Sequence, residues 1–161
     1  TVGVIEYADT YERFKIADIP GLISGANKNK GLGHRFLQHI ERCPVLLHLV
    51  DGTADDVAES YRIIRHELEA YGGGLIDKPE VLVLNKTDAM TEQTIEEKRQ
   101  QLAKASGNDD IVAMSGVSGR NVAEVLRRLV TYIEPLREQE RAERLAANSD
   151  NPIDENAGWT P

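Results

Sequence analysis

The chain alternates short apolar runs with longer stretches in which apolar residues recur every three or four positions. The runs at 45–50 and 81–84 are bounded by polar residues and have the length of buried strands. The helical spacing predicts amphipathic helices at about 54–71 and 119–134, and a more polar helix at about 91–105. Strands that alternate with helices of this length predict an α/β fold with a mostly parallel sheet and helices on both faces.

Further patterns fill in the remaining elements. Residues 2–7 and 12–18 predict a β-hairpin around a polar turn, and residues 111–114 predict one more short strand. Thr53 and Asp56 resemble a capping box for the helix that begins near residue 54.

The composition is that of one acidic domain. A chain of 161 residues is long enough to bury a sizeable core, and its net charge of -8 argues against indiscriminate binding to nucleic acid. The single Cys43 permits no internal disulfide, and no apolar run reaches the roughly 20 residues of a membrane span. We expect a domain at 1–136, followed at 137–161 by a charged helical extension at 137–145 and a disordered acidic tail at 146–161.

The sequence Asn85-Lys86-Thr87-Asp88 follows the apolar run at 81–84 directly. It therefore lies at the carboxyl end of a predicted strand, where open α/β sheets bind ligands. A carboxylate at Asp88 can accept two hydrogen bonds from guanine, one from the ring N–H and one from the exocyclic amino group. Adenine has no matching pair of donors, so this one residue can select the base.

A second motif, Asp18-Ile19-Pro20-Gly21, follows the predicted strand at 12–18. Its carboxylate can hold a water molecule bound to Mg²⁺, and the glycine N–H can approach a γ-phosphate closely. Taken alone, this short motif is as consistent with an ordinary turn at the end of a strand.

A third motif, Met114-Ser115-Gly116, follows the next predicted strand, where backbone N–H groups can bond to guanine O6. Alone it is also an unremarkable loop. The three motifs occur in order, each directly after a predicted strand, and this coincidence favours a guanine-nucleotide site over three unrelated turns.

The combination resembles a GTP-binding domain of the P-loop class. Residues 18–26, 31–43 and 46–51 resemble the Obg/CgtA family of ribosome-associated GTPases, and the resemblance as a whole covers about 2–134. It implies a three-layer P-loop GTPase-like fold, with a mostly parallel sheet and one antiparallel edge strand. It also implies that Mg²⁺ and GTP or GDP are bound.

The resemblance assigns roles to matching positions of this chain. Asp18 would serve the Mg²⁺ shell through water, and Gly21 would contact the γ-phosphate. Asn85 would tie the base loop to the phosphate loop, Lys86 would flank the base and Asp88 would read guanine. The remaining implied nucleotide-binding residues are Ile19, Pro20, Ser115, Gly116 and Val117.

The chain departs from the family because it lacks the G-x-x-x-x-G-K-[ST] phosphate loop and the first switch loop, which precede Gly3 in the family. In that fold the strand that leads into the phosphate loop lies in the middle of the sheet. Its loss would leave two sheet edges unpaired, so we expect a fold that is incomplete at its N-terminus. Residues 1–161 alone are then expected to fold poorly or to bind nucleotide weakly.

Leu22 stands where many GTPases place a glutamine that orients the attacking water, so no catalytic residue is assigned beyond the switch positions Gly21 and Leu22. The resemblance implies a cytoplasmic, monomeric GTPase that acts on the large ribosomal subunit, including its rRNA. The glycine-rich loop at 21–33 has a basic rim that could contact rRNA or simply be solvated. The alternative function is a guanine-nucleotide or ribosome-binding module without hydrolysis, because the phosphate loop is absent.

Overall fold

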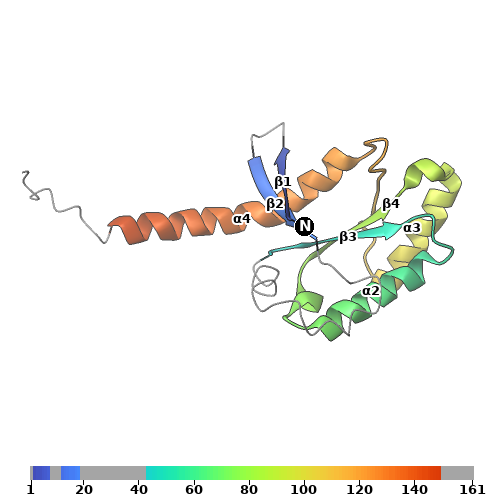
Figure 1. Cartoon of the computed structure of the whole chain (residues 1–161), viewed down its shortest axis with the longest axis horizontal. Helices are drawn as coiled ribbons and strands as arrows, with labels where there is room; N and C mark the ends of the chain where they lie inside the picture. The colour runs from blue at the N-terminus through green and yellow to red at the C-terminus, as the bar shows by residue number, and fades with distance from the viewer. Residues whose placement is uncertain (1, 8–11, 19–42, 150–161) are drawn as a thin grey trace, which may run out of the picture.

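The fold is a parallel sheet enclosed between two helical layers (Figure 1). The computed structural model describes residues 2–7, 12–18 and 43–149. Within this part, the predicted α/β class and its three-layer arrangement are confirmed.

The parallel sheet consists of β3 (Leu46–Asp51), β4 (Glu80–Asn85) and β5 (Val112–Ala113), in that spatial order. Asp51 lies opposite Asn85 in the register of β3 and β4, so the two strands end at the same edge. This edge, called the carboxyl edge below, is where the loops with the candidate chemistry begin.

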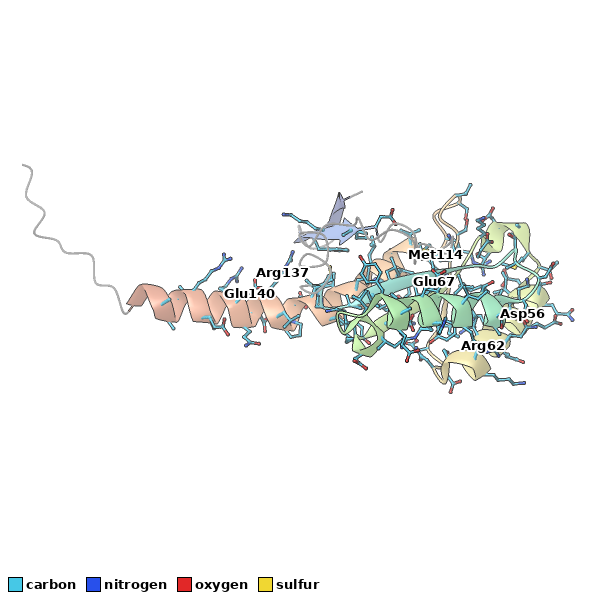
Figure 2. The ribbon with its side chains drawn as sticks, turned by 60° about the horizontal axis from the view of Figure 1, so that its bottom comes forward. Asp56, Arg62, Glu67, Met114, Arg137 and Glu140 are labelled. Atoms are coloured by element: carbon cyan, nitrogen blue, oxygen red, sulfur yellow. The ribbon has the colours of Figure 1, made fainter. Side chains whose placement is uncertain are left out.

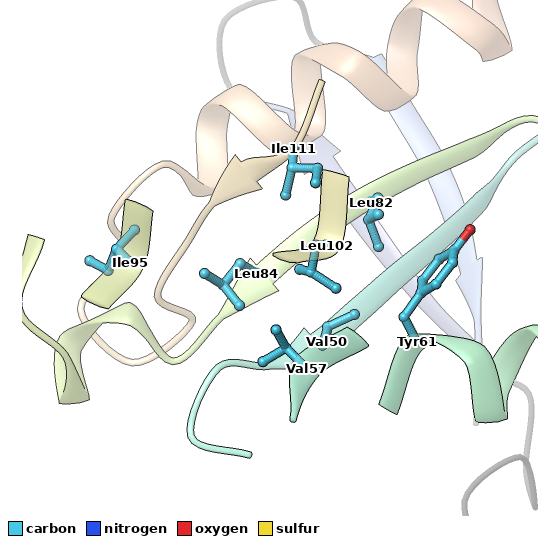
Figure 3. Close-up of a cluster of buried hydrophobic side chains, with 8 residues drawn as sticks. All are labelled: Val50, Val57, Tyr61, Leu82, Leu84, Ile95, Leu102 and Ile111. Atoms are coloured by element: carbon cyan, nitrogen blue, oxygen red, sulfur yellow. The ribbon is translucent and has the colours of Figure 1, made fainter. Parts of the chain in front are cut away.

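Both faces of the sheet are covered. Helices α2 (Val57–Tyr71) and α3 (Glu92–Ser106) cover one face, where they pack on Leu82 and Leu84 of β4 (Figure 3). Helix α4 (Val122–Ser149) packs on the other face. This double burial explains why β4 reads as a continuous apolar run rather than an alternating one. The buried residues on the α4 side are Phe14, Val81, Val83, Val112, Met114, Val125 and Leu129.

The N-terminal hairpin forms a sheet of its own. β1 (Val2–Tyr7) pairs antiparallel with β2 (Glu12–Ala17), as predicted, and in the described part of the chain neither strand pairs with β3. Phe14 of β2 is buried in the cluster beneath α4. Side-chain packing, rather than a strand ladder, therefore attaches the hairpin to the larger sheet.

The start of α2 differs from the prediction. Asp56 is the N-cap residue, because its side chain accepts a hydrogen bond from the Glu59 N–H at 2.8 Å. The N–H and hydroxyl of Thr53 both donate to Asp51 instead, at 2.9 and 2.6 Å. The predicted capping box with Thr53 was therefore wrong: the threonine is bonded to a carboxylate two residues before it.

A polar cluster lies between β3, β4 and α2. Nδ1 of His48 lies 2.7 Å from Oε1 of Glu80, and the two rings of His48 and Tyr61 stack with their centroids 5.3 Å apart. The Tyr61 hydroxyl donates to Glu80 at 3.3 Å. Burial raises the pKa of the Glu80 carboxyl, but the bond with His48 and the nearby Arg65 and Tyr61 outweigh it, so the pKa lies below its ordinary value. His48 is thus a hydrogen-bonded residue of the core.

Helix α4 continues well beyond the sheet. Residues 134–147 are exposed, and Figure 2 shows Arg137 and Glu140 on the part that stands away from the body. The charged extension predicted at 137–145 is thus a continuation of α4, and the boundary proposed after residue 136 falls inside this helix. Residues 146–149, expected in a disordered tail, form its last turn. No helix among the described residues is long and apolar enough to cross a membrane.

Candidate functional site

Two loops meet at the carboxyl edge, one after β4 and one after β5. The first enters the 3-10 helix η3 (Thr87–Ala89), whose Thr87 N–H donates to the Met114 carbonyl at 3.2 Å. The Asn85 side chain adds a second link, because its Oδ1 accepts a hydrogen bond from the Gly116 N–H at 3.2 Å. The structure thus brings together the Asn85–Asp88 motif and the motif at residues 114–116, both predicted from the sequence.

Asp88 is held by a buried serine. Ser115 has 0% of its surface exposed, and its hydroxyl donates to Asp88 Oδ1 at 2.6 Å. Ser115 Oγ in turn accepts a hydrogen bond from the Ser118 N–H at 3.0 Å. Oδ2 of Asp88 accepts no hydrogen bond from another described residue, and the residue is exposed. The carboxylate is therefore oriented at one oxygen and open to a ligand at the other.

One backbone N–H group of the 115–117 loop has no hydrogen-bond partner among the described residues. The Ser115 N–H donates to the Arg120 carbonyl, and the Gly116 N–H donates to Asn85. The Val117 N–H donates to no other described residue, and the Val117 side chain is 89% exposed. In this arrangement the Val117 N–H is a donor available to a carbonyl oxygen such as O6.

Space does not require a glycine at position 116. A Cβ placed there would meet Asn85 Oδ1 at 3.9 Å, which is an ordinary van der Waals contact. Alanine would therefore fit at this position as well.

Lys86 joins the site to the neighbouring strand. Its backbone is left-handed, with φ of 63°, a conformation that residues with a side chain rarely adopt. Its Nζ lies 2.6 Å from Oδ2 of Asp51, at the end of β3. The hydrogen bond from Lys86, followed by those from Thr53, lowers the pKa of the Asp51 carboxyl to about 2, so this group is ionised at neutral pH.

Of the Asp18–Gly21 motif, only Asp18 lies among the described residues, where it is exposed directly after β2. The glycine-rich loop at 21–33 lies outside them. So do four of the predicted site residues: Ile19, Pro20, Gly21 and Leu22.

Comparison with known proteins identifies the family of this chain. Residues 1–86 match the family described as 50S ribosome-binding GTPases. The chain belongs to this family. The resemblance to the Obg/CgtA GTPases that the sequence motifs predicted is thereby confirmed.

Two curated relatives in this GTPase family carry the name GTPase Obg. The protein from Acidiphilium cryptum is 50% identical over 137 residues, which are 85% of this chain and 41% of that protein. The protein from Rhizorhabdus wittichii is 46% identical over 149 residues, which are 92% of this chain and 40% of that protein. The chain thus spans about two-fifths of the length of these relatives.

Sequence reasoning missed the bond that Asp51 makes to Lys86. The pattern does contain a pointer to it, because Asp51 closes one apolar run as Asn85 closes the next. In a parallel sheet these two positions come side by side. No comparable sequence pattern indicated that Lys98 of α3 donates hydrogen bonds to the loop after β3.

Proposed function

We propose that the intact protein is a GTP-binding switch protein of the cytoplasm that hydrolyses GTP and acts in assembly of the large ribosomal subunit. The observation that carries this proposal is the Asp88 carboxylate, held by buried Ser115 at the carboxyl edge of the sheet. Membership of a family described by 50S ribosome binding, and relatives named GTPase Obg, support it.

Guanine would bind with its ring N–H and exocyclic amino group toward Asp88. Ser115 donates its only proton to this carboxylate, which leaves Asp88 an acceptor toward the base. The Val117 N–H would then donate to O6 from the adjacent loop, where guanine has an acceptor and adenine has a donor. The base would thus be read at three atoms by two loops that are already bonded to each other.

Mg²⁺ would bind near Asp18. This ion keeps several waters and takes one or two carboxylates together with phosphate oxygens, so a single exposed aspartate is a suitable ligand through water. Among the described residues no group of three or more His, Cys, Asp or Glu side chains could hold a metal ion, and phosphate oxygens would complete the coordination. When bound, the ion would neutralise charge on the phosphates.

Hydrolysis would depend on groups that Leu22 cannot supply. A leucine has no polar atom with which to orient the attacking water. We infer that intrinsic turnover is slow, and that a partner, a backbone group or a monovalent cation takes the place of a catalytic glutamine.

Contact with the large ribosomal subunit would require a local basic surface, because the chain as a whole carries a net charge of -8. The basic rim that includes Lys28 and Lys30 provides the charge for binding rRNA phosphates. If γ-phosphate orders the glycine-rich loop at 21–33, this contact becomes dependent on the nucleotide state.

The test of base selection is Asp88→Asn in the intact protein. An amide presents a donor where the carboxylate presents an acceptor, so the preference for GDP over xanthosine diphosphate should fall by roughly a hundredfold. Displacement of a fluorescent GDP by each nucleotide measures this ratio. The matched control is Asp77→Asn, which removes the same charge from the 3-10 helix η2 (Leu75–Asp77), at the other end of β4.

An unchanged preference for guanosine in Asp88→Asn would overturn the assignment. A measurement of phosphate release from GTP in the presence of Mg²⁺ distinguishes the two candidate functions. Release by the intact protein supports a GTPase, whereas nucleotide binding without release supports the non-hydrolysing module.

A further inference from the structure

A carboxylate on the neighbouring strand holds the lysine that adjoins the candidate base site. Oδ2 of Asp51 lies 2.6 Å from Nζ of Lys86, across the ends of β3 and β4. We propose that Asp51 is a positioning residue for nucleotide binding, which orders the Lys86 side chain at the carboxyl edge before the nucleotide arrives. This inference rests on the proposed function, because it takes the site beside Lys86 to bind guanine nucleotides.

Asp51 is itself locked in one orientation. The Thr53 N–H and the Thr53 hydroxyl both donate to Oδ1 of Asp51, at 2.9 and 2.6 Å. These two bonds occupy one oxygen and turn the other toward Lys86. The carboxylate is therefore a fixed acceptor rather than a mobile surface charge.

The loop that carries Asp51 is fixed against the base-site loop as well. The Gly52 N–H donates to the Asn85 carbonyl at 2.9 Å. A Cβ at Gly52 would lie 2.6 Å from that carbonyl oxygen and 2.4 Å from Cε of Met90, so only glycine allows this close approach. Lys98 of α3 donates to the carbonyls of Gly52 and Ala54, at 2.8 and 2.6 Å.

The exposure of the ion pair between Asp51 and Lys86 favours a role in nucleotide binding over a role in the stability of the fold. The side chains of Lys86 and Asp51 are 53% and 46% exposed, and ion pairs with this exposure contribute little to the free energy of folding. A free lysine side chain loses rotamer entropy when a ligand orders it. A lysine that is held in advance avoids much of this loss at the binding step.

The experiment uses the intact protein and a fluorescent GDP. In Asp51→Asn, GDP should dissociate about tenfold faster than from the unchanged protein. Asp55→Asn is the matched control, because it removes the same charge four residues along the chain at an exposed position. GDP should leave this control at the unchanged rate. Melting of the nucleotide-free protein should shift by no more than about 2 °C in either variant.

A double-mutant cycle tests whether Asp51 acts through Lys86. In the background of Lys86→Met, which keeps the apolar stem without the ammonium, Asp51→Asn should cause no further loss. Asp51→Glu, which keeps the charge on a longer side chain, should restore part of the lost affinity. An effect of Asp51→Asn that persists in full in Lys86→Met overturns the proposal, as does an unchanged dissociation rate.

The proposed function and the role of Asp51 can be overturned separately. If the protein does not bind GDP, or if Asp88→Asn keeps its guanosine preference, the proposed function is overturned. If Asp88→Asn shifts the base preference while Asp51→Asn releases GDP at the unchanged rate, only the role of Asp51 is overturned. Should Asp51→Asn not fold, Thr53→Val removes one of the bonds that orient Asp51, and a smaller acceleration of release is then expected.

Discussion

Thr87, between Lys86 and Asp88, has 1% of its surface exposed, and its hydroxyl has no partner among the described residues. A buried hydroxyl without a hydrogen bond carries an uncompensated desolvation cost. Its backbone N–H, in contrast, is bonded to Met114 in the adjacent loop. The contribution of Thr87 to the site is therefore made by its backbone and not by its hydroxyl.

Thr87→Val is expected to stabilise the protein by about 1 kcal/mol, because it removes the unpaired hydroxyl and keeps the shape of the side chain. Urea unfolding measures this change. Thr91→Val is the contrasting control, because the Thr91 hydroxyl oxygen caps α3 by accepting from the Thr94 N–H, and its loss should cost about 1 kcal/mol. Destabilisation by Thr87→Val would show that the hydroxyl does have a partner.

The types of the site residues were predictable from the sequence, whereas their bonds were not. Asn85, Asp88 and Ser115 stand out because each has a polar side chain and lies just beyond an apolar run predicted to be a strand. The bond from Ser115 to Asp88 joins residues 27 positions apart. Only the register of the strands and the course of two loops decide such a contact, and periodicity along the chain contains neither.

Glu80, the first residue of β4, is the charged member of the buried cluster with His48 and Tyr61. Its side chain is 14% exposed and lies under α2. Since its pKa is lower in the folded protein than in the unfolded chain, its ionised form stabilises the fold. That stabilisation is complete above the ordinary carboxyl pKa of 4.5 and is lost as pH falls through the lower folded value.

Glu80→Gln should therefore lower the free energy of unfolding by about 1–3 kcal/mol at pH 7, and by progressively less below about pH 4.5. Urea unfolding between pH 3 and pH 7 measures the difference from the unchanged protein. Glu140→Gln, on the exposed part of α4, removes the same charge and should leave stability unchanged across this range. A constant difference at all pH values would contradict this account of Glu80.

The helices and strands were predicted more accurately than the residues at which they begin and end. The strongly periodic stretches gave α2, α3 and the buried strands within a few residues, because burial on one or two faces fixes the apolar pattern. The N-cap of α2 was misplaced by three positions, since Thr53 and Asp56 are both suitable capping residues. The bond between Thr53 and Asp51, which decides the choice, depends on where β3 ends.

At the scale of the whole molecule, two sheets share one core. Phe14 connects the hairpin to the cluster beneath α4, and in the described residues no ladder joins β1 or β2 to the parallel sheet. The resemblance predicted the α/β class and one antiparallel edge strand, and the residue pattern predicted the hairpin. It could not predict how the hairpin attaches here, because that depends on the packing of one aromatic side chain.

Phe14→Ala should remove up to about 3–5 kcal/mol from the protection of the hairpin amides against hydrogen exchange, because a large buried side chain is lost. The amides of β4 should keep most of their protection. Leu129→Ala on α4, in the same cluster, should instead lower protection in the hairpin and in β4 together. Equal loss in both sheets for Phe14→Ala would show that they unfold as one unit.

Helix α4 starts six residues after Gly116 and continues for 28 residues to Ser149, with Pro135 inside it. Proline in a helix interior favours a kink, and residues 136–149 beyond it span about 20 Å at 1.5 Å per residue, so a change of about 10° at Pro135 would displace the far end by about 4 Å. The first turn of α4 adjoins the loop proposed to bind guanine O6, and the exposed end stands away from the sheet (Figure 1). A change in the direction of this exposed part would be large enough at its far end to be measured by a pair of fluorophores.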